Sequence, residues 1–106
     1  MAFQIPKSCT PEEVAARLRD GEDMFILDVR EDGEWADGHI GQAVHIPLGQ
    51  LMQRIDELDR GREITVVCRS GSRSGLACEL LAEHNFNVVN MTGGMNDWTD
   101  RVSYGR

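Results

Sequence analysis

Apolar residues along this chain fall into two patterns that alternate from one end to the other. Short continuous apolar runs have the length of buried strands and occupy residues 24–29, 43–47, 64–67 and 87–91. Apolar residues at helical spacing predict helices over residues 10–20, 48–58 and 72–84, and two glycines at 93–94 lead into one more short helix. Such alternation is typical of βαβ units around a parallel sheet.

The helix near the N-terminus carries the clearest start signal. Thr10 supplies a hydroxyl N-cap, Pro11 occupies the first helical position, and Glu13 lies three residues after the cap. We therefore expect an α/β fold in which a central, mostly parallel sheet of about five strands carries helices on both faces. The 106 residues contain no repeat, linker or low-complexity stretch, so residues 1–106 are expected to form a single domain.

Composition and charge limit the classes of function. Hydrophobic residues make up 41% of the chain and charged residues 27%, which is ordinary globular usage. The net charge of −7 disfavours a nucleic-acid partner, because phosphate binding requires a basic surface. The N-terminus lacks a signal-peptide pattern, and no segment reaches the ~20 apolar residues of a membrane helix. We therefore expect a cytoplasmic protein without a membrane partner.

The chain has three cysteines, Cys9, Cys68 and Cys78, which are odd in number and lack CxxC spacing. The sequence therefore favours neither a disulfide framework nor a zinc site, and we expect no metal and no cofactor. Cys78 lies on the apolar face of the helix predicted over residues 72–84 and is interpreted as a buried structural thiol. Cys68 differs, because a loop of small and basic residues follows it directly.

Cys68 lies at the end of a predicted strand and just before a predicted helix. Ligands of parallel α/β sheets bind at the carboxyl ends of the strands, and the unpaired N–H groups and dipole at a helix start stabilise negative charge. Arg69 and Arg73 add positive charge, and in such surroundings the pKa of a cysteine falls from ~8.5 to between roughly 3.5 and 7.5. We therefore predict a nucleophilic thiolate at Cys68.

Small residues make the loop after Cys68 a candidate anion site. Ser70, Gly71 and Ser72 allow the backbone to curl around the sulfur with its amides turned inward, which forms an anion-binding nest. The serine hydroxyls and the two neighbouring arginines can contact an oxyanion held there. The loop thus indicates an anionic substrate that is attacked by sulfur.

Three segments of the chain resemble the signatures of the rhodanese homology family. Residues 68–74, CRSGSRS, are similar to that family's active-site loop, C-x-x-G-x-R-S. Residues 27–47 resemble its first signature, L-D-V-R followed by an acid-aromatic pair, G-H-I and A-x-N-I-P, and residues 93–98 resemble its closing G-G-x-x-x-W. Two positions depart from the first signature, because Gln42 replaces the usual glycine and His45 stands where asparagine is frequent.

The resemblance to a single-domain rhodanese implies a sulfurtransferase with a rhodanese-like fold. Cys68 would take the sulfane sulfur of thiosulfate or a related anionic donor, hold it as a persulfide, and pass it to cyanide, a cellular thiol or a protein acceptor. Asp28 and Arg30 match the D-V-R of the first signature and are expected to support the loop. The predicted substrate-binding residues are those of the loop itself, namely Arg69, Ser70, Gly71, Ser72, Arg73 and Ser74.

Two other functions stay open at this point. A non-catalytic sulfur carrier or regulatory module would share the cysteine loop, and the sequence does not separate it from a thiosulfate sulfurtransferase. A phosphatase or arsenate reductase of related fold also uses a cysteine in an anion cradle, but such phosphatases need five residues between the cysteine and the arginine. Only four residues separate Cys68 from Arg73, and Val67 stands where a histidine often precedes the phosphatase cysteine. The spacing therefore favours sulfur over phosphate.

Overall fold

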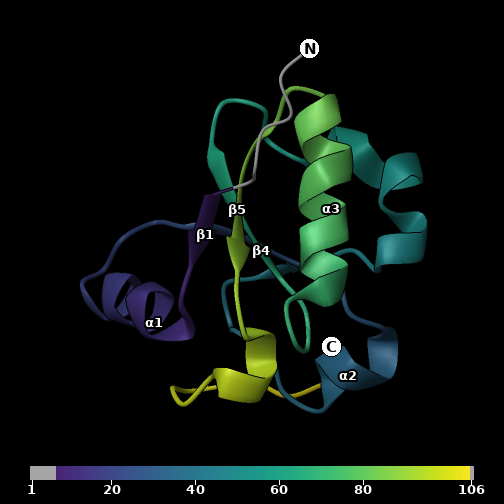
Figure 1. Ribbon diagram of the computed structural model, residues 1–106. Helices are drawn as coiled ribbons and strands as arrows, with labels where there is room; N and C mark the ends of the chain where they lie inside the picture. Colours follow the sequence, from purple (N-terminus) through teal and green to yellow (C-terminus); the bar gives the residue numbers. More distant parts are fainter. Residues whose placement is uncertain (1–6, 106) are drawn as a thin grey trace.

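The computed structural model describes residues 7–105. Figure 1 shows the strands at the centre of the molecule with helices to either side. Helices of the 3₁₀ type are labelled η. The elements follow one another in the order β1 (Lys7–Cys9), α1 (Pro11–Arg19), β2 (Phe25–Asp28), α2 (Asp32–Ala36), β3 (Val44–His45), η1 (Leu48–Gln50), η2 (Met52–Glu57), β4 (Glu63–Val67), α3 (Ser72–Glu83), β5 (Asn87–Met91) and η3 (Gly94–Asp97).

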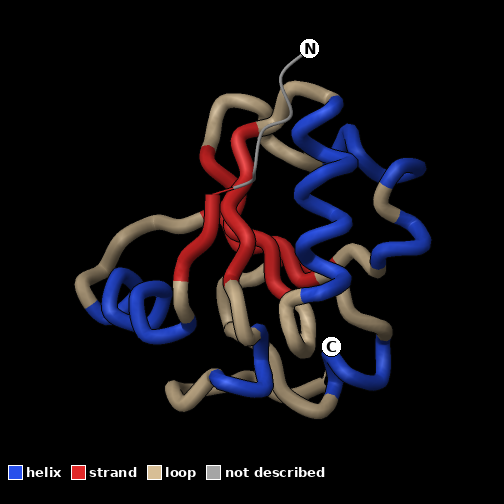
Figure 2. The backbone as a smooth tube through the Cα atoms, viewed as in Figure 1, coloured by secondary structure: helices blue, strands red, loops and turns tan. Residues whose placement is uncertain are grey.

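The strands form one five-stranded sheet in the order β1-β5-β4-β2-β3. Each pair of neighbouring strands is parallel, and Figure 2 shows them running together in red. The expected α/β fold with a mostly parallel sheet of about five strands is confirmed. Because β4 lies at the centre of the sheet, the residue that follows it, Cys68, emerges in the middle of the carboxyl edge.

A separate hydrophobic cluster covers each face of the sheet. On one face, Leu51 and Leu81 pack with Val66 of β4. On the other face, Val14 of α1 packs with Val67 of β4, and side chains of η3 join this cluster. Successive residues of β4 therefore point to opposite faces and are buried on both, which explains why this strand has an uninterrupted apolar sequence. Helices on both faces were expected and are observed.

The start of α1 follows its sequence signal. Glu13 donates its backbone N–H to Thr10 Oγ1 at 3.1 Å, and Thr10 donates its own N–H to Glu13 Oε1 at 2.9 Å. This reciprocal capping box, with Pro11 at the first helical position, satisfies backbone donors that the helix leaves unpaired. No helix within residues 7–105 has the length and apolar character needed to cross a membrane.

The helix expected over residues 48–58 is replaced by two short 3₁₀ helices, η1 and η2. Arg54 has non-helical backbone angles (φ −115°, ψ 16°) and interrupts the second of them. Leu48 and Leu51 lie three residues apart, as do Ile55 and Leu58, and all four contact the same hydrophobic cluster. A spacing of three suits a 3₁₀ turn as well as an α-helix, so apolar periodicity alone did not distinguish the two.

β1 is a strand that the apolar pattern does not predict. Its sequence, KSC, contains no run of apolar residues, yet Ser8 pairs with Asn90 and Cys9 with Met91 of β5. The Cys9 carbonyl also accepts the backbone N–H of Thr92 at 2.9 Å. The strand conformation here comes from pairing with β5, which lies far away in the sequence.

Candidate active site

Cys68 lies directly after the central strand β4, at the carboxyl edge of the sheet. Its side chain is buried, and the strands around it are tightly paired, because Val29 donates its N–H to Val67 O at 2.9 Å. The next residues turn sharply and enter α3 at Ser72. The structure therefore places Cys68 at the strand-to-helix junction that the sequence predicted.

Donor groups of the loop face the cysteine sulfur. Gly71 donates its backbone N–H to Cys68 Sγ at 3.0 Å, and Ser74 Oγ lies 3.3 Å from the same sulfur. Gly71 has φ of +105°, a left-handed backbone conformation that residues other than glycine rarely adopt. The inward-facing nest expected from the small residues is thus present around the sulfur.

Asn90 of β5 is a site residue that sequence reasoning missed. Its Oδ1 lies 2.5 Å from Ser74 Oγ, and its Nδ2 donates to Gly71 O at 3.3 Å. Ser74 Oγ is also 3.1 Å from Gly71 O. Asn90 therefore holds both groups that contact the sulfur. No local sequence signal marks it, because a single amide in an otherwise apolar strand has many possible roles.

The pKa of the Cys68 thiol lies below its ordinary value. Burial is the largest single influence and opposes ionisation, but hydrogen bonds together outweigh it. These bonds come from the Ser74 hydroxyl and from the backbone N–H groups of Ser74, Gly71 and Ser70. A lowered pKa was expected from the sequence, with Arg69 and Arg73 as part of its cause. The larger lowering influences are the Ser74 hydroxyl and the backbone amides, and Arg73 adds a charge attraction to the ionised thiol.

Titration of the three thiols tests this arrangement. Burial, the largest cause, raises the pKa of Cys9 to about 11 and that of Cys78 to about 12, so Cys68 is expected to ionise first as the pH rises. In Ser74→Ala the thiolate loses a hydrogen bond, and the Cys68 midpoint should rise by about one pH unit. The measurement is the thiolate ultraviolet absorbance as a function of pH, taken as the difference from Cys68→Ser.

A matched control for this titration is Ser72→Ala, in the same loop. Ser72 makes no hydrogen bond with the sulfur, so its removal should leave the midpoint unchanged. If the two alanine variants titrate alike, the Ser74 hydroxyl does not stabilise the thiolate.

Arg73 pairs with Glu34 of α2 and makes no hydrogen bond to the sulfur. The guanidinium donates two hydrogen bonds of 2.7 Å to the two carboxylate oxygens. Arg73 is the largest influence on the Glu34 carboxyl and lowers its pKa to about 2. Sequence reasoning missed Glu34, whose only signal was its place in the acid-aromatic pair. The ion pair between Arg73 and Glu34 connects α2 to the first turn of α3, next to the cysteine loop.

Trp35 fixes α2 through a stack of three rings. Its indole lies parallel to the imidazole of His39 at 3.5 Å between centroids and, on the other side, to that of His45 at 4.7 Å. His45 Nε2 contacts Arg30 O, and His39 Nδ1 contacts Trp35 O, each at 2.7 Å. The stack therefore places Glu34, the neighbour of Trp35, opposite the cysteine loop.

Asp28 and Arg30 form a buried ion pair beside the loop. Arg30 donates from Nε and Nη2 to the Asp28 carboxylate, with 2.8 Å between Nη2 and Oδ2. The same Nη2 donates to Gly38 O at 2.8 Å, which ties the end of β2 to the turn after α2. Neither side chain hydrogen-bonds to the sulfur, and a supporting role for the two residues stays a prediction.

Arg69 is the exposed cation of the loop. It lines a pocket of about 360 Å³ together with Met95, Asn96 and Trp98, and its guanidinium has no ion-pair partner within residues 7–105. Ser70 and Ser72 are exposed as well. The described part of the chain contains no cluster of His, Cys, Asp and Glu side chains able to hold a metal ion.

The glycine turn before η3 supports the loop from behind. Met95 donates its N–H to Cys68 O at 2.8 Å, and Asn96 donates to Arg69 O at 2.9 Å. A Cβ atom added at Gly94 would lie 2.5 Å from Cys68 O and 2.6 Å from the Arg69 carbonyl carbon. Only a residue without a side chain allows this approach, so the glycine turn and the cysteine loop form one unit.

Comparisons with known proteins agree with this geometry. The family model described as "Rhodanese-like domain" matches residues 10–101. YtwF of Bacillus subtilis (strain 168) is 39% identical over 92 residues, which cover 87% of this chain and 89% of that protein. A protein of Allochromatium vinosum named "Sulfurtransferase" is 35% identical over 88 residues, 82% of this chain and 82% of that protein.

The fold comparison leads to the same family. The crystal structure of a rhodanese-like domain protein from Staphylococcus aureus matches with a TM-score of 0.88 and 31% sequence identity, covering 94% of this chain and 99% of that chain. The family match spans the capped helix α1, the cysteine loop and the glycine turn that holds it. From its sequence and its fold alike, the chain belongs to the rhodanese-like domain family.

Proposed function

We propose that this protein is a sulfurtransferase that moves a sulfane sulfur from thiosulfate or a related anionic donor to a thiophilic acceptor through a persulfide on Cys68. The name of the Allochromatium vinosum relative supports the class of reaction. The observation that carries the proposal is the pair of donors on the sulfur, namely the Gly71 N–H and the Ser74 hydroxyl. They stabilise a thiolate before the reaction and a persulfide anion after it.

The reaction divides into two displacements. The Cys68 thiolate attacks the outer sulfur of thiosulfate, a sulfur–sulfur bond forms on Cys68, and the bond to the sulfonate breaks with its electron pair leaving on sulfite. Cyanide or a thiolate then attacks the outer sulfur of the Cys68 persulfide, and the Cys68 thiolate is released. Neither step changes the total charge or needs an outside oxidant. A reaction with these two successive displacements is expected to show ping-pong kinetics.

Arg69 is proposed to attract the anionic donor, since it is exposed and lines the pocket beside the loop. Arg73 contributes differently, because its two terminal nitrogens, Nη1 and Nη2, both donate to the carboxylate of Glu34 in α2. We infer that Arg73 holds the loop in place and that Ser70, Gly71, Ser72 and Ser74 provide the donors around the incoming sulfur. This arrangement disfavours a phosphatase, which would need the arginine free for phosphate oxygens.

Mass spectrometry of the intact protein tests the proposal. After incubation with thiosulfate, we expect the mass of one sulfur atom on the peptide that contains Cys68, and its loss as thiocyanate when cyanide is added. A sulfur carrier would load in the same way but transfer slowly to cyanide, so the turnover rate separates the two. Cys68-dependent hydrolysis of p-nitrophenyl phosphate without sulfur loading would instead indicate the phosphatase.

A further inference from the structure

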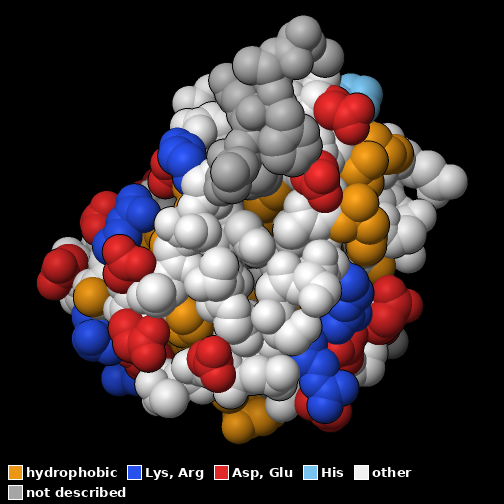
Figure 3. All heavy atoms as spheres, in the orientation of Figure 1, with side chains coloured by type: hydrophobic (Ala, Val, Ile, Leu, Met, Phe, Trp, Pro, Cys, Tyr) orange, Lys and Arg blue, Asp and Glu red, His pale blue; other side chains and the backbone are white. Residues whose placement is uncertain are grey.

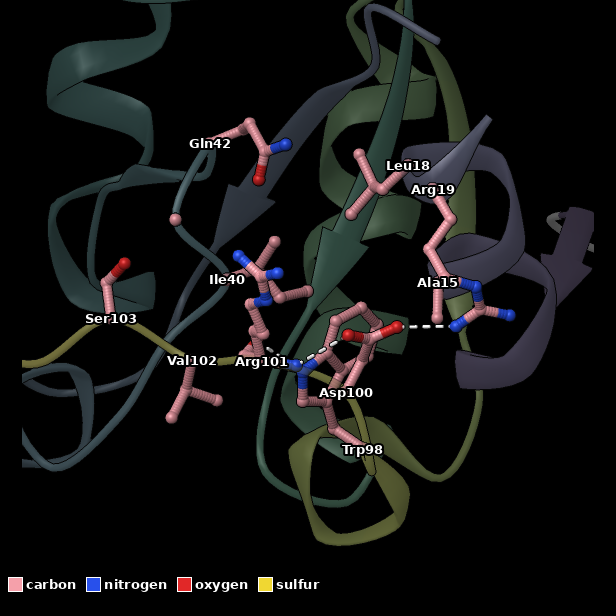
Figure 4. A pocket seen from close by; sticks show the side chains of 11 residues that line it. Ala15, Leu18, Arg19, Ile40, Gln42, Trp98, Asp100, Arg101, Val102 and Ser103 are labelled. Atoms are coloured by element: carbon pink, nitrogen blue, oxygen red, sulfur yellow. Dashed lines mark hydrogen bonds and ion pairs between the residues drawn. The ribbon is translucent and has the colours of Figure 1, made fainter. Parts of the chain in front are cut away.

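A second cavity within the described residues has no lining residue from the cysteine loop. It has a volume of about 750 Å³ and is bounded by α1, the turn at residues 40–42 and the segment at residues 98–103, as Figure 4 shows. No residue of the loop from Cys68 to Ser74 lines it. Its volume falls in the range of roughly 300–1,000 Å³ that small-molecule sites occupy. Trp98 and Val102 line both this cavity and the pocket beside Arg69, but none of the groups that contact the Cys68 sulfur lines it.

One wall of this cavity is apolar. Leu18 of α1 and Trp98 are half-buried and supply its accessible surface, and Ile40 also lines it but is almost completely buried. Trp98 donates its indole N–H to Arg101 O at 3.0 Å, so the polar group of the ring is already satisfied and its remaining surface is apolar. The wall can therefore pack against an aliphatic or aromatic body.

The charges in the cavity leave one cation unpaired. The Asp100 carboxylate accepts the backbone N–H of Arg101 at 2.7 Å and the side chain of Arg19 at 2.5 Å, and these contacts, in that order, hold the pKa of Asp100 below its usual range. The guanidinium of Arg101 has no hydrogen-bond or ion-pair partner within residues 7–105. On the face drawn in Figure 3, basic side chains mostly have acidic neighbours.

Gln42 supplies a second free donor on the opposite side of the cavity. Figure 4 shows the Arg101 guanidinium extending toward Ile40 and Gln42. Within the described residues, the Gln42 amide also makes no hydrogen bond. An occupant that reaches both donors must offer acceptor atoms, and a negative charge suits the guanidinium best.

We propose that this cavity binds a small organic carboxylate with an apolar body. The carboxylate lies between Arg101 and Gln42, and the body packs against Leu18 and Trp98. An inorganic anion would leave the apolar wall uncovered, whereas a neutral apolar molecule would desolvate the two donors without pairing them. Charge complementarity and an apolar wall together select this class of ligand.

Nitrogen–proton correlation spectra with three probes test the proposal. Hydrocinnamate is expected to bind with a dissociation constant in the low-millimolar range or tighter, and to shift the amide signals of residues 40–42 and 98–103. The indole signal of Trp98 should move, while that of Trp35, inside its ring stack, should not. Hydrocinnamamide, which lacks the charge, and acetate, which lacks the body, should each bind at least about tenfold more weakly.

Variants assign the binding to the two donors. Arg101→Ala should weaken hydrocinnamate binding at least about tenfold, and Gln42→Ala should weaken it by a smaller factor. Arg54→Ala, which removes an exposed arginine from η2, is the matched control and should change nothing. The proposal is overturned if the amide binds as well as the acid, if Arg101→Ala binds like Arg54→Ala, or if the shifts lie elsewhere. Sulfur loading of Cys68 is unaffected by either outcome.

Discussion

Cys68→Ser is expected to reduce sulfur transfer from thiosulfate to cyanide to the rate of the uncatalysed reaction, a loss of at least about three orders of magnitude. The serine hydroxyl is not ionised at neutral pH, and its oxygen does not replace sulfur in a persulfide. Thiocyanate formation under saturating thiosulfate measures this loss, and the mass of the variant should not increase. Circular dichroism should show an unchanged fold, because serine has nearly the same size.

Cys78→Ala is the matched control for that experiment. Cys78 is also fully buried, but no donor within residues 7–105 hydrogen-bonds to its sulfur as Gly71 does to that of Cys68, and burial raises the pKa of its thiol to about 12. This variant should therefore retain sulfur transfer close to that of the unaltered protein. The proposed mechanism is wrong if Cys68→Ser keeps its rate, or if Cys78→Ala loses as much.

Gly94→Ala is expected to lower the free energy of unfolding by at least about 2 kcal/mol and to impair sulfur transfer as well. Gly94 has φ of +60°, and its added Cβ would meet Cys68 O at 2.5 Å. Either η3 or the cysteine loop has to shift, which weakens the hydrogen bonds that Met95 and Asn96 donate to the loop. Chemical denaturation measures the stability, and thiocyanate formation below the unfolding temperature measures the effect on the site.

Gly49→Ala serves as the control for this substitution. Gly49 lies in η1, has no atom within 4 Å of an added Cβ, and does not have a positive φ. The free energy of unfolding of Gly49→Ala should differ from that of the unaltered protein by less than about 0.5 kcal/mol, and its sulfur transfer should be unaffected. If Gly94→Ala behaves like Gly49→Ala, the glycine turn does not hold the loop.

Local chemistry made much of this protein predictable. The capping box at Thr10 and the apolar run before Cys68 depend on residues that are neighbours in the chain, and both formed as expected. Small residues after the cysteine favoured a nest, and Gly71 adopts the left-handed conformation that turns its N–H toward the sulfur. These features need only the conformational preferences of a few consecutive residues.

Contacts between distant segments were not predictable in the same way. Arg73 was expected to face the anion, yet it pairs with Glu34, 39 residues earlier in the chain. Asn90 holds Ser74 from another strand, and β1 exists through pairing with β5. None of these partners has a sequence signal of its own, because each depends on which strands become neighbours.

The sequence by itself determined the order of most strands and helices, the position of Cys68 between them, and the small residues that surround its sulfur, because each rests on local periodicity and backbone freedom. Only the tertiary structure decided which groups lower the pKa of Cys68, where Arg73 points, and how Gly94 braces the loop. Those outcomes depend on distances between segments that the folded sheet brings together. The cavity with Arg101 and Gln42 arises in the same way, from α1 and a C-terminal segment that meet only in the folded chain.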